Sequence, residues 1–230
     1  TVLMMNHATG EGIMTVYQVM PGVMICFSDM HMEKCDSEFE LQKDKKVLCI
    51  DHCREGRIEM EVQPGVFSIM QENDLRLDNR ENHKGTTYYP LRHYHGVSVF
   101  MDVKETQKAL DTMFHGFSVD IAQLRMRCCT QDKPYVIRND EGLSRIISSF
   151  YQRNIERPEI SASKEYYQIK VVEMLLYLET MTVENSREIR LYEEIYGYDG
   201  CKQRHGVLVY FQRVHEKPVL YRLIYKGWQT

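Results

Sequence analysis

The sequence lacks any hydrophobic run long enough to cross a membrane, which takes roughly 20 apolar residues. The best candidate, residues 171–178, is short and is interrupted by Glu173. The N-terminus also lacks the charged segment and cleavage site of a signal peptide. These absences predict a protein with no membrane association.

The sequence also lacks a disulfide framework. Its seven cysteines are odd in number, and Cys128 and Cys129 are adjacent, whereas small secreted domains carry an even set of cysteines in a shorter chain. Cys49 and Cys53 are spaced more widely than the usual Cys-x2-Cys pair of a zinc site, and no second pair follows. We therefore expect free thiols, a cytoplasmic location and no zinc site at the cysteines.

Two signatures of phosphate binding are missing as well. Gly10-Glu11-Gly12 is followed neither by a third glycine nor by Lys-Ser/Thr, so no phosphate-binding loop is expected. A net charge of −4 and a pI near 6.1 argue against a surface built to bind nucleic-acid phosphates. With 43% hydrophobic and 27% charged residues, the 230-residue chain has the composition of one large or two small globular domains.

The first half of the sequence has the pattern of short strands. Ile58, Met60 and Val62 alternate with charged residues, and turns such as Pro21-Gly22 separate neighbouring runs. The predicted strands are 13–20, 23–28, 47–53, 57–62, 66–70, 74–78 and 97–103. Strands of this length at this spacing are typical of a closed barrel or a sandwich.

After Val103 the pattern becomes helical. The predicted helices are 104–114, 118–127, 142–154 and 164–181, with Ser118 and Ser163 as N-caps of the second and the fourth. The fourth helix is apolar nearly all round, which indicates burial on more than one side. It packs either wholly within this chain or at a subunit interface. In the remainder, 184–230, we expect a short helix at 187–196 and a hairpin of 207–214 and 219–225.

The most suggestive polar pair is His93 and His95. Residues two apart on a strand face the same side, and this side also carries Val97, so both imidazoles are expected to point into the barrel interior. A metal site could add His52 or His83 as a third ligand. Otherwise the two histidines hydrogen-bond in a ligand pocket or are core residues.

Several stretches together resemble the N-terminal regulatory half of bacterial AraC-type transcription regulators. They are VYQVMPGV (16–23), CIDHCREGRIE (49–59), DLRLDNR (74–80), YPL (89–91) with HYHG (93–96), and KVVEMLLYL (170–178). The resemblance covers roughly residues 13–183. None of these stretches is a catalytic signature.

The resemblance implies an α+β chain with a cupin-like β-barrel at 13–103 and an α-helical dimerisation region at 104–183. It further implies a homodimer that senses a small-molecule effector for transcription control and is not an enzyme. The family's DNA-binding half carries two helix-turn-helix units, and the divergent tail 184–230 contains no recognisable one. DNA binding is therefore expected only through a module not recognisable in this chain.

The candidate ligand-binding residues are Asp51, His52, Tyr88, His93 and His95. The alternative is a cupin-type metalloenzyme that uses His93 and His95. Metal-binding cupins, however, carry a glutamate four or five residues after the second histidine, where this chain has Val99 and Phe100.

Asp51, His52 and Cys53 do not form a catalytic triad by themselves, because neighbours on a strand point to opposite faces. For the same reason, we expect at least one of Asp51 and His52 to lie outside the pocket. No catalytic residue, metal or cofactor is assigned.

Overall fold

The structure is a computed structural model that describes residues 1–38, 45–63, 66–81, 84–129, 134–137, 140–151 and 163–181. The helix and hairpin predicted within 184–230 lie outside the described residues, as does His83. Among the described residues, no helix is long and apolar enough to cross a membrane.

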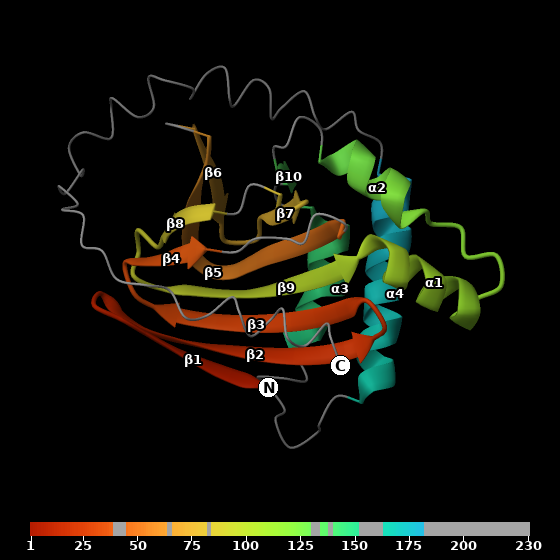
Figure 1. Ribbon diagram of the computed structural model, residues 1–230, viewed down its shortest axis with the longest axis horizontal. Helices are drawn as coiled ribbons and strands as arrows, with labels where there is room; N and C mark the ends of the chain where they lie inside the picture. Colours follow the sequence, from red (N-terminus) through yellow and green to blue (C-terminus); the bar gives the residue numbers. More distant parts are fainter. Residues whose placement is uncertain are drawn as a thin grey trace.

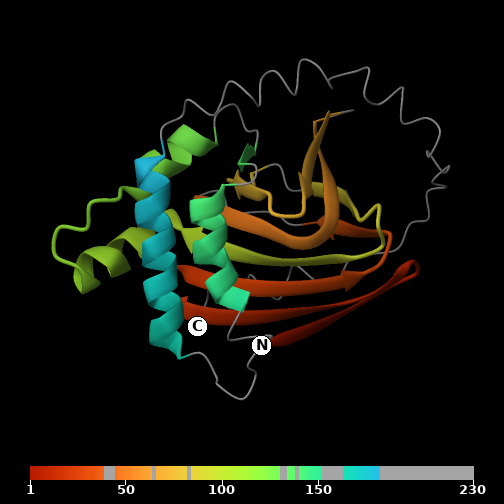
Figure 2. The ribbon, with the colours of Figure 1, turned by 180° about the vertical axis from the view of Figure 1, so that it is seen from behind.

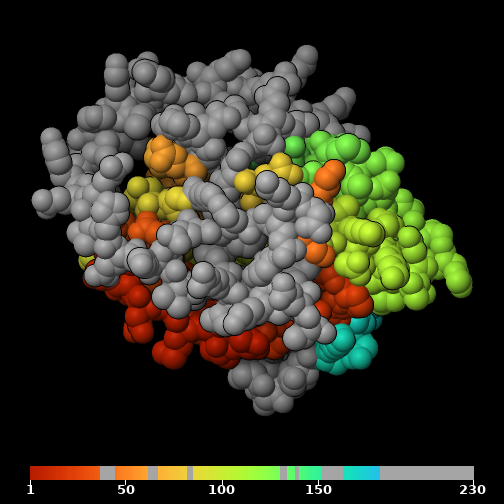
Figure 3. All heavy atoms as spheres, viewed as in Figure 1, coloured from red at the N-terminus to blue at the C-terminus, as the bar shows by residue number. Residues whose placement is uncertain are grey.

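The strands β1 to β9 come first along the chain and the helices follow, with the short strand β10 between α2 and α3 (Figure 1). The strands are β1 (Val2–His7), β2 (Gly10–Met20), β3 (Val23–His31), β4 (Lys34–Glu38), β5 (Val47–Gln63), β6 (Val66–Gln71), β7 (Leu75–Asp78), β8 (Lys84–Tyr88), β9 (Tyr94–Asp102) and β10 (Tyr135–Ile137). The helices are α1 (Val103–Met113), α2 (Ile121–Cys128), α3 (Glu141–Tyr151) and α4 (Lys164–Thr180). The space-filling view shows α1 and α2 projecting to one side of the strands (Figure 3).

All described strand pairs are antiparallel, and the long strand β5 connects two groups of strands. Its first part joins β9 and β7 in the order β1-β2-β3-β9-β5-β7-β10. Its second part pairs with β6 and β8, and β8 pairs with β4. We call these groups the first sheet and the second sheet. A register shift between Cys53 and Glu55 marks a bulge in β5 at the change of sheet.

Gly56 makes this bulge possible. Its φ is +89°, in the region that side chains rarely adopt, and a Cβ at this position would lie 2.1 Å from the carbonyl oxygen of His93. The close approach of the two backbones holds β5 against the start of β9. It thereby fixes the position of Glu55 relative to His93, which directly precedes β9, and to His95 within β9.

Both faces of the first sheet are buried, each in a different core. One face contributes Ile25 and Val99 to a cluster that also contains Phe150 of α3 and Val171 of α4. Figure 2 shows α3 and α4 crossing this face. The other face contributes Cys49 to a cluster shared with Met70 of the second sheet, among other residues. The first sheet is therefore the middle layer between the helices and the second sheet.

The predicted α+β class is confirmed, and so is the fourth helix, whose first turn is capped by the Ser163 side chain. The cap of α2 is Asp120, not Ser118, because the Asp120 carboxylate accepts the backbone N–H of Gln123. The predicted strands 47–53 and 57–62 form one strand, since the intervening residues make a bulge instead of a turn. Sequence patterns missed β1, β4, β8 and β10.

The predicted direction of His93 and His95 is wrong. Val97, which shares their strand parity, belongs to the core between the first sheet and the helices. His95 accordingly points to the helix side, where its ring meets Tyr151 of α3. Because apolar residues cover both faces of β9, alternation alone did not reveal which face meets which layer.

Candidate ligand-binding site

Tyr151, the last residue of α3, connects the helices to the candidate histidines. A 3.1 Å hydrogen bond joins its hydroxyl to Nδ1 of His52 on β5. The His95 ring lies edge-on, 5.7 Å from the Tyr151 ring, and the Arg54 guanidinium lies 5.0 Å from the ring centre. One helical side chain thus contacts polar residues of both β5 and β9. We call this group of four residues the Tyr151 junction.

The hydrogen bond in the Tyr151 junction joins two neutral groups. Burial, helped by the nearby charge of Arg54, lowers the pKa of His52 to about 4. Burial also raises the pKa of Tyr151 well above its usual value. The contact between sheet and helix therefore depends on an uncharged imidazole.

This burial predicts a loss of stability in mild acid. An unfolded histidine binds a proton near pH 6.5, whereas folded His52 does so only near pH 4. Between these values the unfolded state binds more protons, so the free energy of unfolding should fall by about 3 kcal/mol as the pH drops from 6.5 to 4. Urea unfolding across this range should show a smaller pH dependence for His52→Gln than for wild type. His115→Gln, which replaces an exposed histidine, should keep the wild-type dependence, and equal curves for all three proteins would contradict this assignment.

Glu55 brings His93 and His95 together at the bulge of β5. Nε2 of His93 lies 3.2 Å from one Glu55 carboxylate oxygen, and Nδ1 of His95 lies 3.9 Å from the other. The hydrogen bond with His93 lowers the pKa of Glu55. Unlike the Tyr151 junction, this contact is open to solvent, since half of the Glu55 side chain is exposed.

Asp51 lies on the opposite face of β5, in a buried charge cluster. Arg76 Nε and Nη2 donate to its carboxylate at 3.0 and 2.8 Å, Arg80 Nη2 donates at 2.7 Å, and Ser98 Oγ donates at 2.6 Å. Burial alone would raise the pKa of Asp51, but the charges of Arg80 and Arg76 hold it well below its usual range. Arg80 also donates to Asp78, at 3.0 Å. Asp51 is thus an ionised centre that holds β5, β7 and β9 together.

The structure gathers three of the five candidate residues on one side. His52 and His95 meet at Tyr151, and His93 joins His95 through Glu55. Asp51 faces the other way, as strand alternation predicts. Tyr88 lies on β8 of the second sheet, where its ring is 6.3 Å from that of Phe67.

Sequence reasoning missed Glu55, Arg54 and Tyr151. Glu55 stands next to the glycine that forms the bulge, but its register opposite His95 follows from the pairing of β5 with β9, which the sequence alone did not reveal. Tyr151 follows His52 by 99 positions. No short-range pattern connects two residues so far apart in the sequence.

No family model matches the sequence, and no curated protein does. Similar solved structures include the AraC-like transcriptional activator CuxR, with 10% identity and a TM-score of 0.48 over 98% of this chain and 84% of that chain. ToxT from Vibrio cholerae has 11% identity and a TM-score of 0.37 over 69% of this chain and 54% of its own, so this chain spans about half of ToxT. A conserved protein with a double-stranded β-helix domain from Klebsiella pneumoniae has 11% identity and a TM-score of 0.32 over 44% and 84%. One of these neighbours, CuxR, is thus described as AraC-like, and the sequence resembles the AraC-type family.

Proposed function

We propose that this chain is the effector-sensing and self-association part of a bacterial AraC-type transcription regulator, and that it works as a cytoplasmic homodimer. The resemblance of the sequence to this family supports the role. The six cysteines among the described residues are free thiols, which suits a reducing compartment. The observation that carries the proposal is the surface of α4.

Helix α4 has apolar residues on two faces. Its inner face is buried against the sheet and α3 through Tyr167, Val171, Met174, Leu175 and Leu178. On its outer face, Ile169 is 62% exposed and Leu176 is 42% exposed. These two residues are seven positions apart, about two helical turns, so they lie on one side of the helix, with half-buried Val172 between them. We call these three residues the α4 stripe.

The α4 stripe is suited to bind a second copy of this chain. If two α4 helices cross antiparallel about a two-fold axis, Ile169 of one protomer lies next to Leu176 of the partner subunit, so the stripe is complementary to itself. Lys170 and Glu173 form a 2.7 Å ion pair beside the stripe. This neighbouring pair carries no net charge, so it adds no repulsion between like charges.

A ligand can act on this dimer through the Tyr151 junction. Tyr151 and the inner face of α4 belong to one core. An effector held by His52, His93 and His95 that prefers one arrangement of α3 and α4 would shift the dimer equilibrium by its difference in affinity. Asp51 and Tyr88 stay predictions for contacts from the other face of the sheet.

The competing interpretation is a cupin-type metalloenzyme that uses His93 and His95 inside the barrel. The two imidazoles instead share Glu55 at a solvent-exposed bulge, and His95 meets α3. The face toward the second sheet carries the Asp51 cluster. We therefore favour a regulatory protein over an enzyme.

The test of self-association is the double variant Ile169→Glu, Leu176→Glu. Wild type should be a dimer in analytical ultracentrifugation, and the variant should dissociate at least about 100-fold more readily, because two carboxylates replace buried apolar contacts. The matched control is Leu91→Glu, since Leu91 is 64% exposed but lies between β8 and β9. A monomeric wild type, or equal dissociation of the control, would overturn the proposal.

A further inference from the structure

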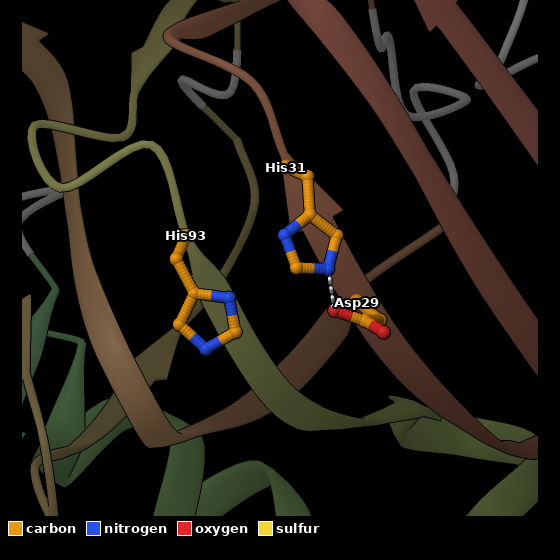
Figure 4. A group of neighbouring side chains, drawn as sticks. All are labelled: Asp29, His31 and His93. Atoms are coloured by element: carbon orange, nitrogen blue, oxygen red, sulfur yellow. Dashed lines mark ion pairs between the residues drawn. The ribbon is translucent and has the colours of Figure 1, made fainter.

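A second group of polar residues lies beside Glu55 and shares only His93 with the effector-binding residues of the proposed function. Asp29 and His31 are two apart near the end of β3 and point to the same side. His93 comes directly before β9, the strand that pairs with β3, so it lies next to His31. The two imidazole rings are 5.1 Å apart, and Nε2 of His31 lies 3.0 Å from the Asp29 carboxylate (Figure 4).

We propose that Asp29, His31 and His93 bind one divalent transition-metal ion. Each offers a ligand atom, and the three atoms all lie within 4.8 Å of one another. Bonds of about 2.0–2.2 Å from a metal to nitrogen and oxygen put any two ligands of one ion at most about 4.4 Å apart. The side chains of Asp29, His31 and His93 are 53%, 57% and 36% exposed. Small side-chain rotations can therefore bring the three ligand atoms within the distance that one ion requires.

The ligand types select the class of metal. Two imidazole nitrogens and one carboxylate suit Zn²⁺, Co²⁺, Ni²⁺ or Fe²⁺, whereas Ca²⁺ and Mg²⁺ prefer sites built from oxygen alone. Protein ligands from three positions leave room for water or a further ligand. A site of this kind on the surface can exchange its metal with solvent.

Glu55 supplies the support that a metal-bound histidine normally has. Its carboxylate contacts Nε2 of His93 at 3.2 Å, which leaves Nδ1 of that ring for the metal. A carboxylate on the outer nitrogen fixes the tautomer and the orientation of a ligating imidazole. His93 is thus oriented before any metal arrives.

This set of ligands differs from the pair of histidines that the sequence singles out. His95 is replaced by His31, which comes from another strand, and the carboxylate is Asp29 instead of a residue that follows His95. An exposed ion pair such as Asp29–His31 adds only about 0–1 kcal/mol to stability. Its loss in a variant therefore leaves the fold intact.

Metal binding by the purified chain tests the proposal, with Co²⁺ as the probe. Equilibrium dialysis should find one Co²⁺ per wild-type chain. His31→Gln and Asp29→Asn should each weaken binding at least about tenfold, since losing a ligand costs no less than losing an outer-shell partner. His115→Gln, an exposed histidine outside the cluster, should bind as wild type does.

The absorption spectrum of the cobalt complex separates this site from the free thiols. Ligation by imidazole and carboxylate gives no thiolate charge-transfer band in the near ultraviolet, whereas binding at cysteine does. Such a band, unchanged binding in His31→Gln, or no bound cobalt in wild type would each overturn the site. The Ile169→Glu, Leu176→Glu variant should keep full cobalt binding, so failure of the dimer proposal and failure of the metal proposal are distinguishable.

Discussion

Replacing Asp51 with alanine should lower the free energy of unfolding by about 3–5 kcal/mol. The Asp51 carboxylate is 2% exposed and pairs with Arg76 and Arg80, which are 2% and 5% exposed. Without it, two buried guanidinium groups lose the carboxylate that they share, although Arg80 keeps its hydrogen bond to Asp78. An uncompensated buried charge is among the most destabilising changes that one substitution makes.

The measurement is urea denaturation followed by circular dichroism at neutral pH, where Asp51 is ionised. Ser98→Ala should lower the free energy of unfolding by a smaller amount, about 1.5–3 kcal/mol, because it removes one hydrogen bond to a charged group. Asp29→Asn is the matched control, since that carboxyl is 53% exposed and should cost no more than about 1 kcal/mol. A loss at Asp51→Ala as small as that of the control would show that the cluster does not hold the sheet.

Acid should weaken the same cluster. Because the folded pKa of Asp51 is depressed, its contribution is fully present above the unfolded value, about 3.9, and is lost as the pH falls toward the folded value. The loss at Asp51 therefore begins below about pH 4. This pH range lies below the range in which His52 destabilises the fold. A pH series therefore distinguishes the contributions of Asp51 and His52 to the free energy of unfolding.

Strand alternation predicted that Asp51 and His52 point to opposite faces, and this is confirmed. Alternation depends only on backbone geometry, so it holds wherever the strand is regular. It did not reveal which face meets the helices, because both faces of the first sheet are buried and both carry apolar residues. The predicted direction of the His95 side chain was therefore wrong, although the prediction that it shares a face with Val97 was right.

Sequence patterns could predict only those parts of the candidate site whose residues are close together in the sequence. Ser163 was predicted as a cap because a cap and its helix are adjacent in sequence. By contrast, His31 and His93 are brought together by the pairing of β3 with β9, and Tyr151 reaches His52 only once α3 packs on the sheet. Long-range pairing and packing decide these contacts, so no short pattern contains them.

Replacing Phe150 with alanine should cost about 3–5 kcal/mol, since it removes a large side chain from the middle of the core. Phe150 is fully buried, and its ring stacks on Tyr167 of α4 at 6.2 Å. Phe114→Ala is the matched control: Phe114 is 39% exposed beside Phe117, and its loss should cost much less.

The same variant tests whether sheet and helices form one cooperative unit. Phe150 belongs to a cluster that runs from Ile25 and Val99 of the sheet to Val171 of α4. If this core is continuous, urea should unfold helix and sheet together, and Phe150→Ala should shift both by the same amount. Circular dichroism reports the helices, and hydrogen exchange at β3 and β9 reports the sheet. Helices that melt while these strands stay protected would show that the sheet is stable without them, and a signal could then not pass through Tyr151 as proposed.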